Sequence, residues 1–262
     1  FTTQFGEDEL AIAGGLINDP IRLVKCETSD IEVPAEAEII LEGKVLAKSM
    51  TEEGPFGEVT GGYAMEGSTE IFQLDCITHR KNPLFYGMHS GAPMGDPQSI
   101  TGTCIEVALH EHLSKVEGGM DILDIRCLGI SGLMAIVIKI RPKVHGQAKT
   151  ALMAALSGPY MHPKLAIAVD DDIDAGDLRQ IFWSMTTRVH AEKDVIKIPN
   201  TRIWSLDNAS DIVPGMSAMY RTGTKTIIDA TKPPMSHPEH REKFARALPK
   251  NYEKIDLAHF ME

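Results

Sequence analysis

Several features that would place this 262-residue chain in a familiar class are missing from its sequence. Its four cysteines are scattered and form no C-x-x-C pair, which argues against a disulfide framework or a zinc site and favours a reduced, cytoplasmic protein. No apolar run approaches the roughly 18 residues that span a bilayer, and the start does not resemble a signal peptide. The net charge of −11, without any run rich in lysine or arginine, argues against a nucleic-acid-binding face.

Common catalytic and nucleotide-binding motifs are also missing. No G-x-G-x-x-G follows a predicted strand, no G-x-S-x-G elbow is present, and "GTKTIID" lacks the glycine spacing of a P-loop. The histidines show no H-E-x-x-H or paired-ligand spacing. We therefore interpret most of them as surface or satisfied core residues: His79, His89, His110, His112 and His162.

What is present indicates an ordinary soluble protein of more than one domain. Hydrophobic residues make up 43% of the chain and charged residues 24%, and the length exceeds that of the commonest single domains. The chain opens "FTTQFGEDELAIAGG", with no initiator methionine and directly into apparent structure. We expect it to derive from a longer polypeptide, by processing, proteolysis or incomplete coverage.

The first part of the chain has strand character. After a short helical turn or strand end in "ELAIAGG" come four segments rich in branched or aromatic residues: "PIRLVKCE", "AEIILEGKVLA", "EIFQLDCITHRKN" and "LFYGMHS". Because no long helix separates them, they predict an antiparallel sheet or barrel over about the first 95 residues. A helix is then predicted over 99–118, capped by Ser99, with Ile105, Leu109 and Leu113 at helical spacing.

The second part alternates strands and helices. Strands are predicted in "ILDIRCLG", "LMAIVIKI", "KLAIAV" and "VIKIP", and helices in "HGQAKTALMAALSG" and "DAGDLRQIFWSMTTR". This alternation favours a layered α/β domain. Beyond about residue 200 the sequence becomes irregular, and the end looks like a polar helical tail.

Two acidic motifs are candidates for chemistry. In "EGPFGE", Gly54, Pro55 and Gly57 restrict or permit special backbone angles, so the turn holds Glu53 and Glu58 at a set separation. Two close, partly desolvated carboxyl groups differ in proton affinity, and one can then act as an acid near neutral pH. The alternative is a tight hairpin with two solvated glutamates.

The second acidic motif is "VDDDID", residues 169–174, which follows a strand and precedes a helix. Its carboxylates are suitable ligands for a metal ion. The competing interpretation, which we favour, is that the aspartates cap the following helix and interact with the positive end of its dipole.

Taken together, the motifs resemble the UbiD family. The resemblance rests on the order and spacing of "DELAIAGGL", "VPAEAEIILEG", "EGPFGEVTGGY", "CITHRKNPLFY", "AVDDDID", "IFWSMTTR" and "TKTIIDATKP", and it covers essentially the whole chain. Members are reversible, non-oxidative decarboxylases that use prenylated FMN. The resemblance implies a small-molecule substrate, an aromatic or α,β-unsaturated carboxylic acid, with CO₂ as the second product.

The resemblance also implies a mixed α+β and α/β fold of defined order. Residues 1–98 would form part of a split β-barrel that binds prenylated FMN, and 99–118 a linking helix. Residues 119–235 would form a C-terminal α/β domain for oligomerisation. Residues 236–262 would form a helical tail that reaches a neighbouring subunit in a homo-oligomer, a dimer or higher.

Residue by residue, the resemblance implies a site. Glu58 would be the proton donor and acceptor, and Glu53 would orient the surrounding network with a family arginine. Glu9 would help to hold a divalent metal, Mn²⁺ or Mg²⁺, that bridges the flavin phosphate, and a monovalent cation such as K⁺ is a further cofactor candidate. The candidates for the substrate pocket are Ile100, Thr101, Trp204 and Leu206.

The chain departs from the family pattern at its start. The N-terminal region that supplies the arginine, two further metal ligands and much of the phosphate site precedes "DELAIAGG" in the family and is not in this sequence. We therefore expect either a missing N-terminal segment or a partner chain to complete the site. Two alternatives stay open, a non-catalytic subunit or assembly module of a multi-chain decarboxylase, and an FMN oxidoreductase on a similar split barrel.

Overall fold

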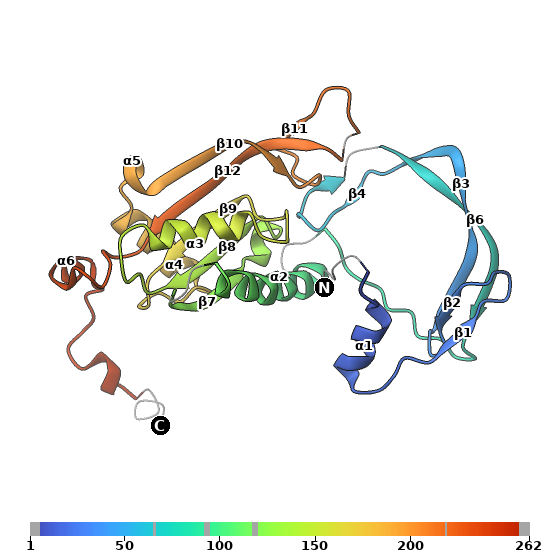
Figure 1. Ribbon diagram of the computed structural model, residues 1–262, viewed down its shortest axis with the longest axis horizontal. Helices are drawn as coiled ribbons and strands as arrows, with labels where there is room; N and C mark the ends of the chain where they lie inside the picture. The colour runs from blue at the N-terminus through green and yellow to red at the C-terminus, as the bar shows by residue number, and fades with distance from the viewer. Residues whose placement is uncertain (1–5, 65–66, 92–94, 117–119, 218, 257–262) are drawn as a thin grey trace. The chain divides into compact units, whose positions relative to one another are not determined.

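The computed structural model of the chain describes residues 6–64, 67–91, 95–116, 120–217 and 219–256 (Figure 1). It divides into two compact units, Phe1–Thr101 and Gly102–Glu262, which are described separately. The division falls inside the helix that was predicted as a linker. None of the helices in the described ranges combines the length and the apolar character that a membrane crossing requires.

The first unit is built of one short helix and three separate antiparallel strand pairs. Its elements are α1 (Glu9–Ile17), β1 (Leu23–Lys25), β2 (Glu32–Pro34), β3 (Ile39–Glu53), β4 (Phe56–Gly57), β5 (Tyr63–Ala64) and β6 (Gly67–His79). The strands pair as β1–β2, β3–β6 and β4–β5, all antiparallel, as the sequence predicts. The strand predicted in "LFYGMHS" is wrong, because residues 84–90 have no regular structure. Aromatic content suggested a strand there, but no neighbouring strand pairs with the segment.

Helix α1 is defined by its two ends. The Asp8 carboxylate accepts hydrogen bonds from the Leu10 and Ala11 amides at 2.9 and 3.2 Å, which satisfies two amides of the first turn. At the other end Asn18 adopts the left-handed conformation, with φ of 57°, and its amide bonds back to Gly15. The segment is therefore a true helix of nine residues.

The long β3–β6 hairpin has one strongly apolar face. Leu41 pairs with Ile77 and Val45 with Phe72, so these side chains project from the same side of the ladder. A Cβ at Gly43 would lie 2.1 Å from the Gln73 carbonyl oxygen and 2.7 Å from the Phe72 ring, so no larger residue fits there without a shift of the backbone. Within the first unit these four apolar side chains remain between 46% and 59% exposed. Such a face requires a partner surface.

The opposite face of the hairpin is fixed by a buried carboxylate. Glu42 is only 5% exposed. It accepts hydrogen bonds from the Thr28 hydroxyl at 2.6 Å and from the Thr28 and Glu27 amides at 2.7 and 2.9 Å. The Thr28 hydroxyl, followed by the Glu27 amide, lowers the pKa of Glu42. This carboxylate ties the β1–β2 turn to β3.

The second unit is a mixed six-stranded sheet with helices packed on it (Figure 1). Its helices are the larger part of α2 (Asp96–Ser114), then α3 (Gln147–Leu156), α4 (Leu178–Arg188), α5 (Ala191–Asp194) and α6 (Pro238–Arg241). Its strands are β7 (Ile122–Cys127), β8 (Ala135–Ile140), β9 (Leu165–Val169), β10 (Val195–Ile203), β11 (Asp211–Ile212) and β12 (Arg221–Ala230). Short 3₁₀ turns lie at Gly129–Ser131, Glu242–Phe244 and Tyr252–Lys254. The strand order is β10-β12-β9-β8-β7, and β11 pairs with β12.

The core of this unit forms around β9. The strand pairs in parallel with β8 on one side and β12 on the other. Ile167 and Val169 pack with Ile181 of α4, and the intervening Ala166 and Ala168 are fully buried. Both faces of the strand are therefore covered, as expected for the parallel centre of an α/β sheet. The predicted layered α/β architecture is confirmed, as is the mixed α+β class of the whole chain.

Several predicted boundaries are corrected. Helix α2 begins at Asp96, not at residue 99, and Ser99 lies inside it, where its hydroxyl donates to the Gly95 carbonyl at 3.1 Å. The tail predicted as helical over 236–262 contains, within its described part, the short helix α6 and two 3₁₀ turns. The irregular region predicted beyond residue 200 contains β12, an internal strand of the sheet.

We expect Glu42→Gln to remove an acid-sensitive part of the stability. Because the folded-state pKa of Glu42 is lowered, its contribution is fully present above the ordinary glutamate pKa of about 4.3 and is lost as the pH falls through the lower folded value. Thermal unfolding between pH 3 and 6 should show a smaller loss of stability in the variant than in the wild type. Glu70→Gln, at an exposed position on β6, is the matched control. Identical pH profiles for the wild type and both variants would contradict this role.

Candidate functional site

The Glu58 hairpin, residues 53–64, is the most constrained candidate element. Strands β4 and β5 pair Phe56 with Ala64 and Gly57 with Tyr63. In the turn between them, the Glu58 amide donates to the Gly62 carbonyl at 2.8 Å, and the Glu58 carbonyl accepts from the Gly61 amide at 2.9 Å. Both backbone groups of Glu58 are thus satisfied inside a tight turn, so its Cα–Cβ direction is fixed.

The hairpin packs against a second glycine. A Cβ on Gly57 would lie 3.2 Å from the Gly91 Cα, and a Cβ on Gly91 would lie 3.0 Å from the Gly57 Cα. Gly91 also has φ of +94°, a conformation that other residues rarely adopt. The two backbones therefore approach as closely as glycines allow. This contact positions the hairpin immediately before Glu58.

A buried glutamine fixes the other side of the turn. Gln98, on α2, is 1% exposed, and its side-chain amide donates to the Val59 carbonyl at 2.7 Å. The Glu58 carboxylate, which is half-buried, accepts from the Val59 amide at 3.0 Å. Sequence reasoning did not find Gln98 or Gly91, because both contacts join segments far apart in the chain.

Glu53 and Glu9 lie in more open surroundings. Glu53 is the exposed last residue of β3, and among the contacts that the structure describes none joins it to Glu58. The predicted close carboxylate pair is therefore not part of the described geometry. Glu9 is exposed in the first turn of α1, beside the cap residue Asp8. It offers one oxygen donor of the kind that hard divalent ions prefer.

The pocket candidates fall in two groups. Ile100, which is 52% exposed, and Thr101 lie in the early turns of α2, just after the Gln98 that holds the Glu58 turn. Trp204 and Leu206 are half-buried in the second unit, in the loop after β10. The structure thus links the first group to the Glu58 hairpin through Gln98, whereas the second group belongs to the other unit.

The loop that carries Trp204 and Leu206 is held by a charged pair. Asp207 is 5% exposed, and both of its carboxylate oxygens accept from Lys164 at 2.8 Å. The Asp207 amide in turn donates to the Trp204 carbonyl at 3.0 Å. The Trp204 and His162 rings are in tilted contact, with centroids 4.3 Å apart and an angle of 54° between their planes. The interpretation of His162 as a satisfied residue is wrong in part: its buried Nδ1 has no hydrogen-bond partner among the described residues.

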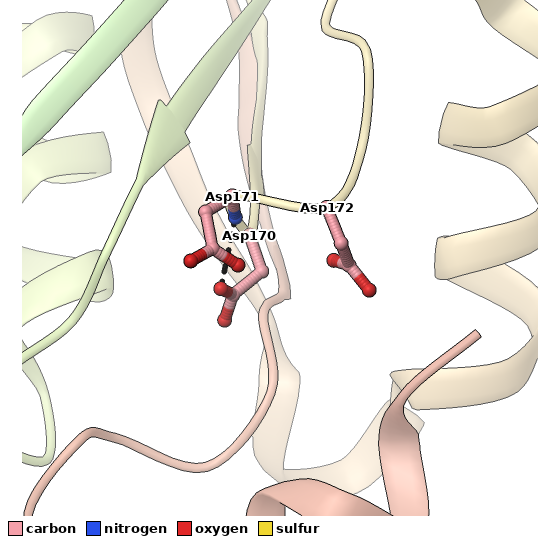
Figure 2. Close-up of side chains that lie close together, drawn as sticks. All are labelled: Asp170, Asp171 and Asp172. Carbon is pink, nitrogen blue, oxygen red and sulfur yellow. Dashed lines mark hydrogen bonds between the residues drawn. The ribbon is translucent and has the colours of Figure 1, made fainter. Parts of the chain in front are cut away.

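The aspartates after β9 form the tightest acidic cluster of the described residues (Figure 2). One carboxylate oxygen from each of Asp170, Asp171 and Asp172 lies within 4.8 Å of the others. Asp170 is fully buried, and its carboxylate accepts from the Asp171 amide at 2.8 Å. Figure 2 shows the Asp170 and Asp171 side chains together and that of Asp172 set apart from them.

Cationic side chains occupy this cluster, so it does not fit a metal ion. They are contributed by Arg141, Arg188, Lys232 and Arg241. The Lys232 ammonium lies 3.1–3.5 Å from all three carboxylates. A metal at this position would have to displace it. Burial raises the pKa of Asp170. Burial acts in the same direction on Asp172, but Arg188 and Lys232 together outweigh it and lower that pKa.

The capping interpretation of "VDDDID" is corrected as well. The residue that caps α4 is Asp177, whose carboxylate accepts from the Arg179 amide at 2.9 Å. Asp170 and Asp172 instead bind side chains from distant segments: Arg241 donates to Asp170 at 2.8 Å, and Arg188 binds Asp172 at 3.0 and 2.7 Å. The motif is an ion-pair network that joins β9 to α4 and to the chain after β12.

The fold places the protein in a known structural class. Solved structures of UbiD-class enzymes share this fold. The structure of HmfF from Pelotomaculum thermopropionicum, in complex with FMN, matches 99% of this chain and 55% of its own, with a TM-score of 0.82 and 31% identity. Vanillic acid decarboxylase from Sedimentibacter hydroxybenzoicus, in its open form with truncated ShVdcD, matches 94% of this chain and 51% of its own, at TM-score 0.76 and 30% identity.

Sequence comparison gives the family. The 3-octaprenyl-4-hydroxybenzoate carboxy-lyase Rift-related domain matches residues 1–93, and the C-terminal domain of the same enzymes matches residues 98–230. The chain therefore belongs to the UbiD family. Phenolic acid decarboxylase of Bacillus subtilis (strain 168) is 33% identical over 246 residues, which are 93% of this chain and 50% of the relative. The chain thus spans about half the length of the relatives it matches.

We expect Gly91→Ala to loosen the Glu58 hairpin. A left-handed alanine costs about 1–2 kcal/mol by itself, and here its Cβ would also meet the Gly57 backbone. Hydrogen exchange of the Glu58 amide should become at least about tenfold faster, since its bond to Gly62 opens more often. Gly215→Ala is the matched control, because φ there is +78° and no atom lies within 4 Å of the added Cβ. Equal exchange rates at Glu58 in both variants would disprove the packing role.

We expect Arg188→Met to destabilise the second unit by about 3 kcal/mol, the cost of breaking a buried ion pair. The Arg188 side chain is 1% exposed and holds Asp172 through two bonds. Urea unfolding measures the change. Arg179→Met, on the same helix but 94% exposed, should stay within about 0.5 kcal/mol of the wild type. Losses of similar size in the two variants would count against a special role for the network.

Proposed function

We propose that the chain is the catalytic part of a reversible, non-oxidative decarboxylase that acts on an aromatic or α,β-unsaturated carboxylic acid with prenylated FMN. The observation that carries the proposal is the Glu58 hairpin, a single carboxyl group held by glycine packing, a tight turn and Gln98. Family membership and the decarboxylase relatives support it. One solved neighbour is in complex with FMN, and an evolved dimeric form of it is in complex with prFMN.

The chemistry explains why such a rigid carboxyl group is needed. Loss of CO₂ from an aromatic or alkenyl carbon would leave a carbanion in an sp² orbital that cannot delocalise. When bound, the flavin supplies the electron sink for this charge. The remaining task falls to the protein, which must orient the acid and return a proton to the same carbon.

Glu58 is the group that we assign to this proton transfer. General acid catalysis requires the donor within hydrogen-bond reach of the reacting atom, so a misplaced carboxyl group loses most of its effect. The turn at Gly61 and Gly62 fixes the Glu58 backbone, and the Gln98 bond to Val59 prevents the turn from shifting along α2. In the reverse direction the carboxylate would accept the proton before CO₂ adds. Glu53, at the start of the same hairpin, would orient the polar network around it.

The divalent metal is the least complete part of the assignment. Glu9 fits it in chemistry, because a carboxylate oxygen is a suitable ligand for Mn²⁺ or Mg²⁺. A hard divalent ion takes about six ligands, and within the described residues the metal-like cluster is the Asp170–Asp172 group, which its cations fill. Further ligands would have to come from outside the described residues. The same holds for a monovalent cation such as K⁺.

The apolar face of the β3–β6 hairpin indicates where the rest of the protein binds. Leu41, Val45, Phe72 and Ile77 are half exposed, yet they stand in register on one face. We assign this face to the polypeptide that supplies the other half of the family's length, either a preceding segment or a partner chain. The solved vanillic acid decarboxylase, named ShVdcCD with a truncated ShVdcD, is a neighbour of the multi-chain type.

The α/β unit is proposed as the part that forms the homo-oligomer. On α4, Phe182 is 67% exposed and Leu178 is 43% exposed, so the helix presents apolar side chains on its outer side. An evolved form of the neighbour HmfF is described as dimeric. If this unit served assembly alone, the chain would be a non-catalytic subunit, and the Glu58 variant described next would leave turnover unchanged.

We expect Glu58→Gln in the holoenzyme to lower turnover by at least about a hundredfold, because the amide cannot donate the proton. Flavin content, measured by absorbance of the purified protein, should remain that of the wild type. Glu52→Gln, at an exposed neighbouring position of β3, is the matched control and should keep full activity. Near-normal turnover of Glu58→Gln would show that the proton donor is another group.

A further inference from the structure

A cavity of about 270 Å³ lies within the second unit, where its parallel strands end. Strands β8, β9 and β12 run parallel, and the cavity is lined by Pro142, just after β8, and by Thr231, just after β12. In open α/β sheets, ligands bind in crevices outside the carboxyl ends of the strands. Small-molecule sites begin at a volume of roughly 300 Å³. The cavity therefore has the location and nearly the size of a ligand site.

The first turn of α3 lines this cavity and has no cap. Gly146 occupies the N-cap position, no side chain makes a capping hydrogen bond there, and no residue of the first turn is acidic. Gly146, Ala148 and Lys149 line the cavity, and Ala148 is 2% exposed, so the turn is buried. The free amides of a buried helix start normally have acceptors. An anion is the acceptor that both these amides and the helix dipole favour.

A buried arginine is a second, independent indication of a ligand. The Arg188 side chain is 1% exposed and lines the same cavity. Its Nη1 and Nη2 atoms bind Asp172, and Nη2 also donates to the Phe244 carbonyl at 2.8 Å. Because the guanidinium group is planar, its Nε–H lies on the same edge as the bond to Phe244, which is itself a lining residue. Nε has no acceptor among the described residues, and a buried donor of this kind needs an explanation.

The charged side chains of the lining leave a donor for an anion. Lys149 donates to Asp194 at 3.2 Å and to one backbone carbonyl at 2.7 Å, which leaves an ammonium donor for a ligand. The two carboxylates of the lining have local partners. Asp194 also accepts from the His190 amide at 2.9 Å, and Asp229 accepts from the Thr231 hydroxyl at 2.7 Å. Both carboxylates are therefore already bound to donors of the protein.

We propose that this cavity binds the phosphate group of a small organic phosphate ester, with the first-turn amides of α3, the Lys149 ammonium and the Arg188 Nε as donors. A phosphate group offers several strong acceptor oxygens to donors that come from different elements. It fills only part of the cavity, and Pro142, Val144 and Phe244 add apolar lining for the organic part. The inference is independent of the proposed decarboxylation, because all of these residues belong to the α/β unit.

Isothermal titration of the holoenzyme with phenyl phosphate, at fixed ionic strength, tests the site. We expect saturable binding with a Kd below about 1 mM. Lys149→Gln should weaken the binding at least about tenfold, because a charge-assisted hydrogen bond is lost. Lys197→Gln, at an exposed lysine of β10, should leave it unchanged. Inorganic phosphate should bind more weakly than the ester, whereas equal affinities would support the phosphate site with the free ion as its ligand.

A pair of variants at Gly146 locates the binding even if Lys149→Gln disturbs the ion pair with Asp194. No atom lies within 4 Å of an added Cβ at Gly146, but φ is +85°, so aspartate and asparagine carry similar backbone strain and differ in charge. Gly146→Asp should bind phenyl phosphate at least about tenfold more weakly than Gly146→Asn, because its carboxylate repels the anion. Equal affinities of these two variants, an unchanged affinity in Lys149→Gln, or no saturable binding to the wild type would each overturn the proposal.

Discussion

The close approach of Gly57 and Gly91 is the contact on which the candidate site depends. A side chain at either position would force the two segments apart, because an added Cβ would lie only 3.0–3.2 Å from backbone atoms. The contact holds the hairpin one residue before Glu58, and Gln98 holds it one residue after. The carboxyl group therefore has little freedom other than rotation of its own side chain. Such pre-organisation is what a proton donor needs, since proximity and orientation supply a large part of its catalytic effect.

The two acidic motifs, the Glu58 hairpin and the aspartates after β9, differ in whether cationic side chains contact their carboxylates. Asp170 and Asp172 lie in a network in which each carboxylate has cationic partners, so the charge is neutralised and the network stabilises the link between β9, α4 and the chain after β12. The Glu58 carboxylate accepts from one backbone amide, that of Val59, and no cation is among its described contacts. The difference supports chemistry at the first motif and architecture at the second.

Much of the fold could be predicted from local sequence, and the failures have physical causes. Strand β9 is an uninterrupted run of branched and small apolar residues, and β8 is one apart from Lys139, so their burial was evident. Strand β12 was missed because its sequence, "RTGTKTIIDA", begins with polar residues and glycine. Its Lys225 is nevertheless buried, since the ammonium group donates to the Leu156 carbonyl at the end of α3. Only the tertiary structure reveals that partner.

Only part of the candidate site could be predicted from the sequence. Glu58 stands in a turn whose glycines are visible in the sequence, whereas Gly91 and Gln98 gain their roles from contacts that no local pattern contains. In the aspartate run, composition allowed metal ligands but favoured helix caps, and neither interpretation fits the structure. The positions of two cationic residues decide the role of the run. Lys232 lies about 60 residues downstream, and Arg188 lies on α4. The role of this run of aspartates could therefore be assigned only when the positions of its cationic partners were known.

The central claim is that the hairpin delivers the Glu58 carboxyl group to the carbon that loses CO₂. The most direct measurement is a crystal structure of the holoenzyme with a bound aromatic acid. The account predicts a Glu58 oxygen within about 3.5 Å of that carbon, or one water molecule away, with the Gly57–Gly91 and Gln98–Val59 contacts intact. A structure in which Glu58 points into bulk solvent while another acidic group lies beside the reacting carbon would contradict it.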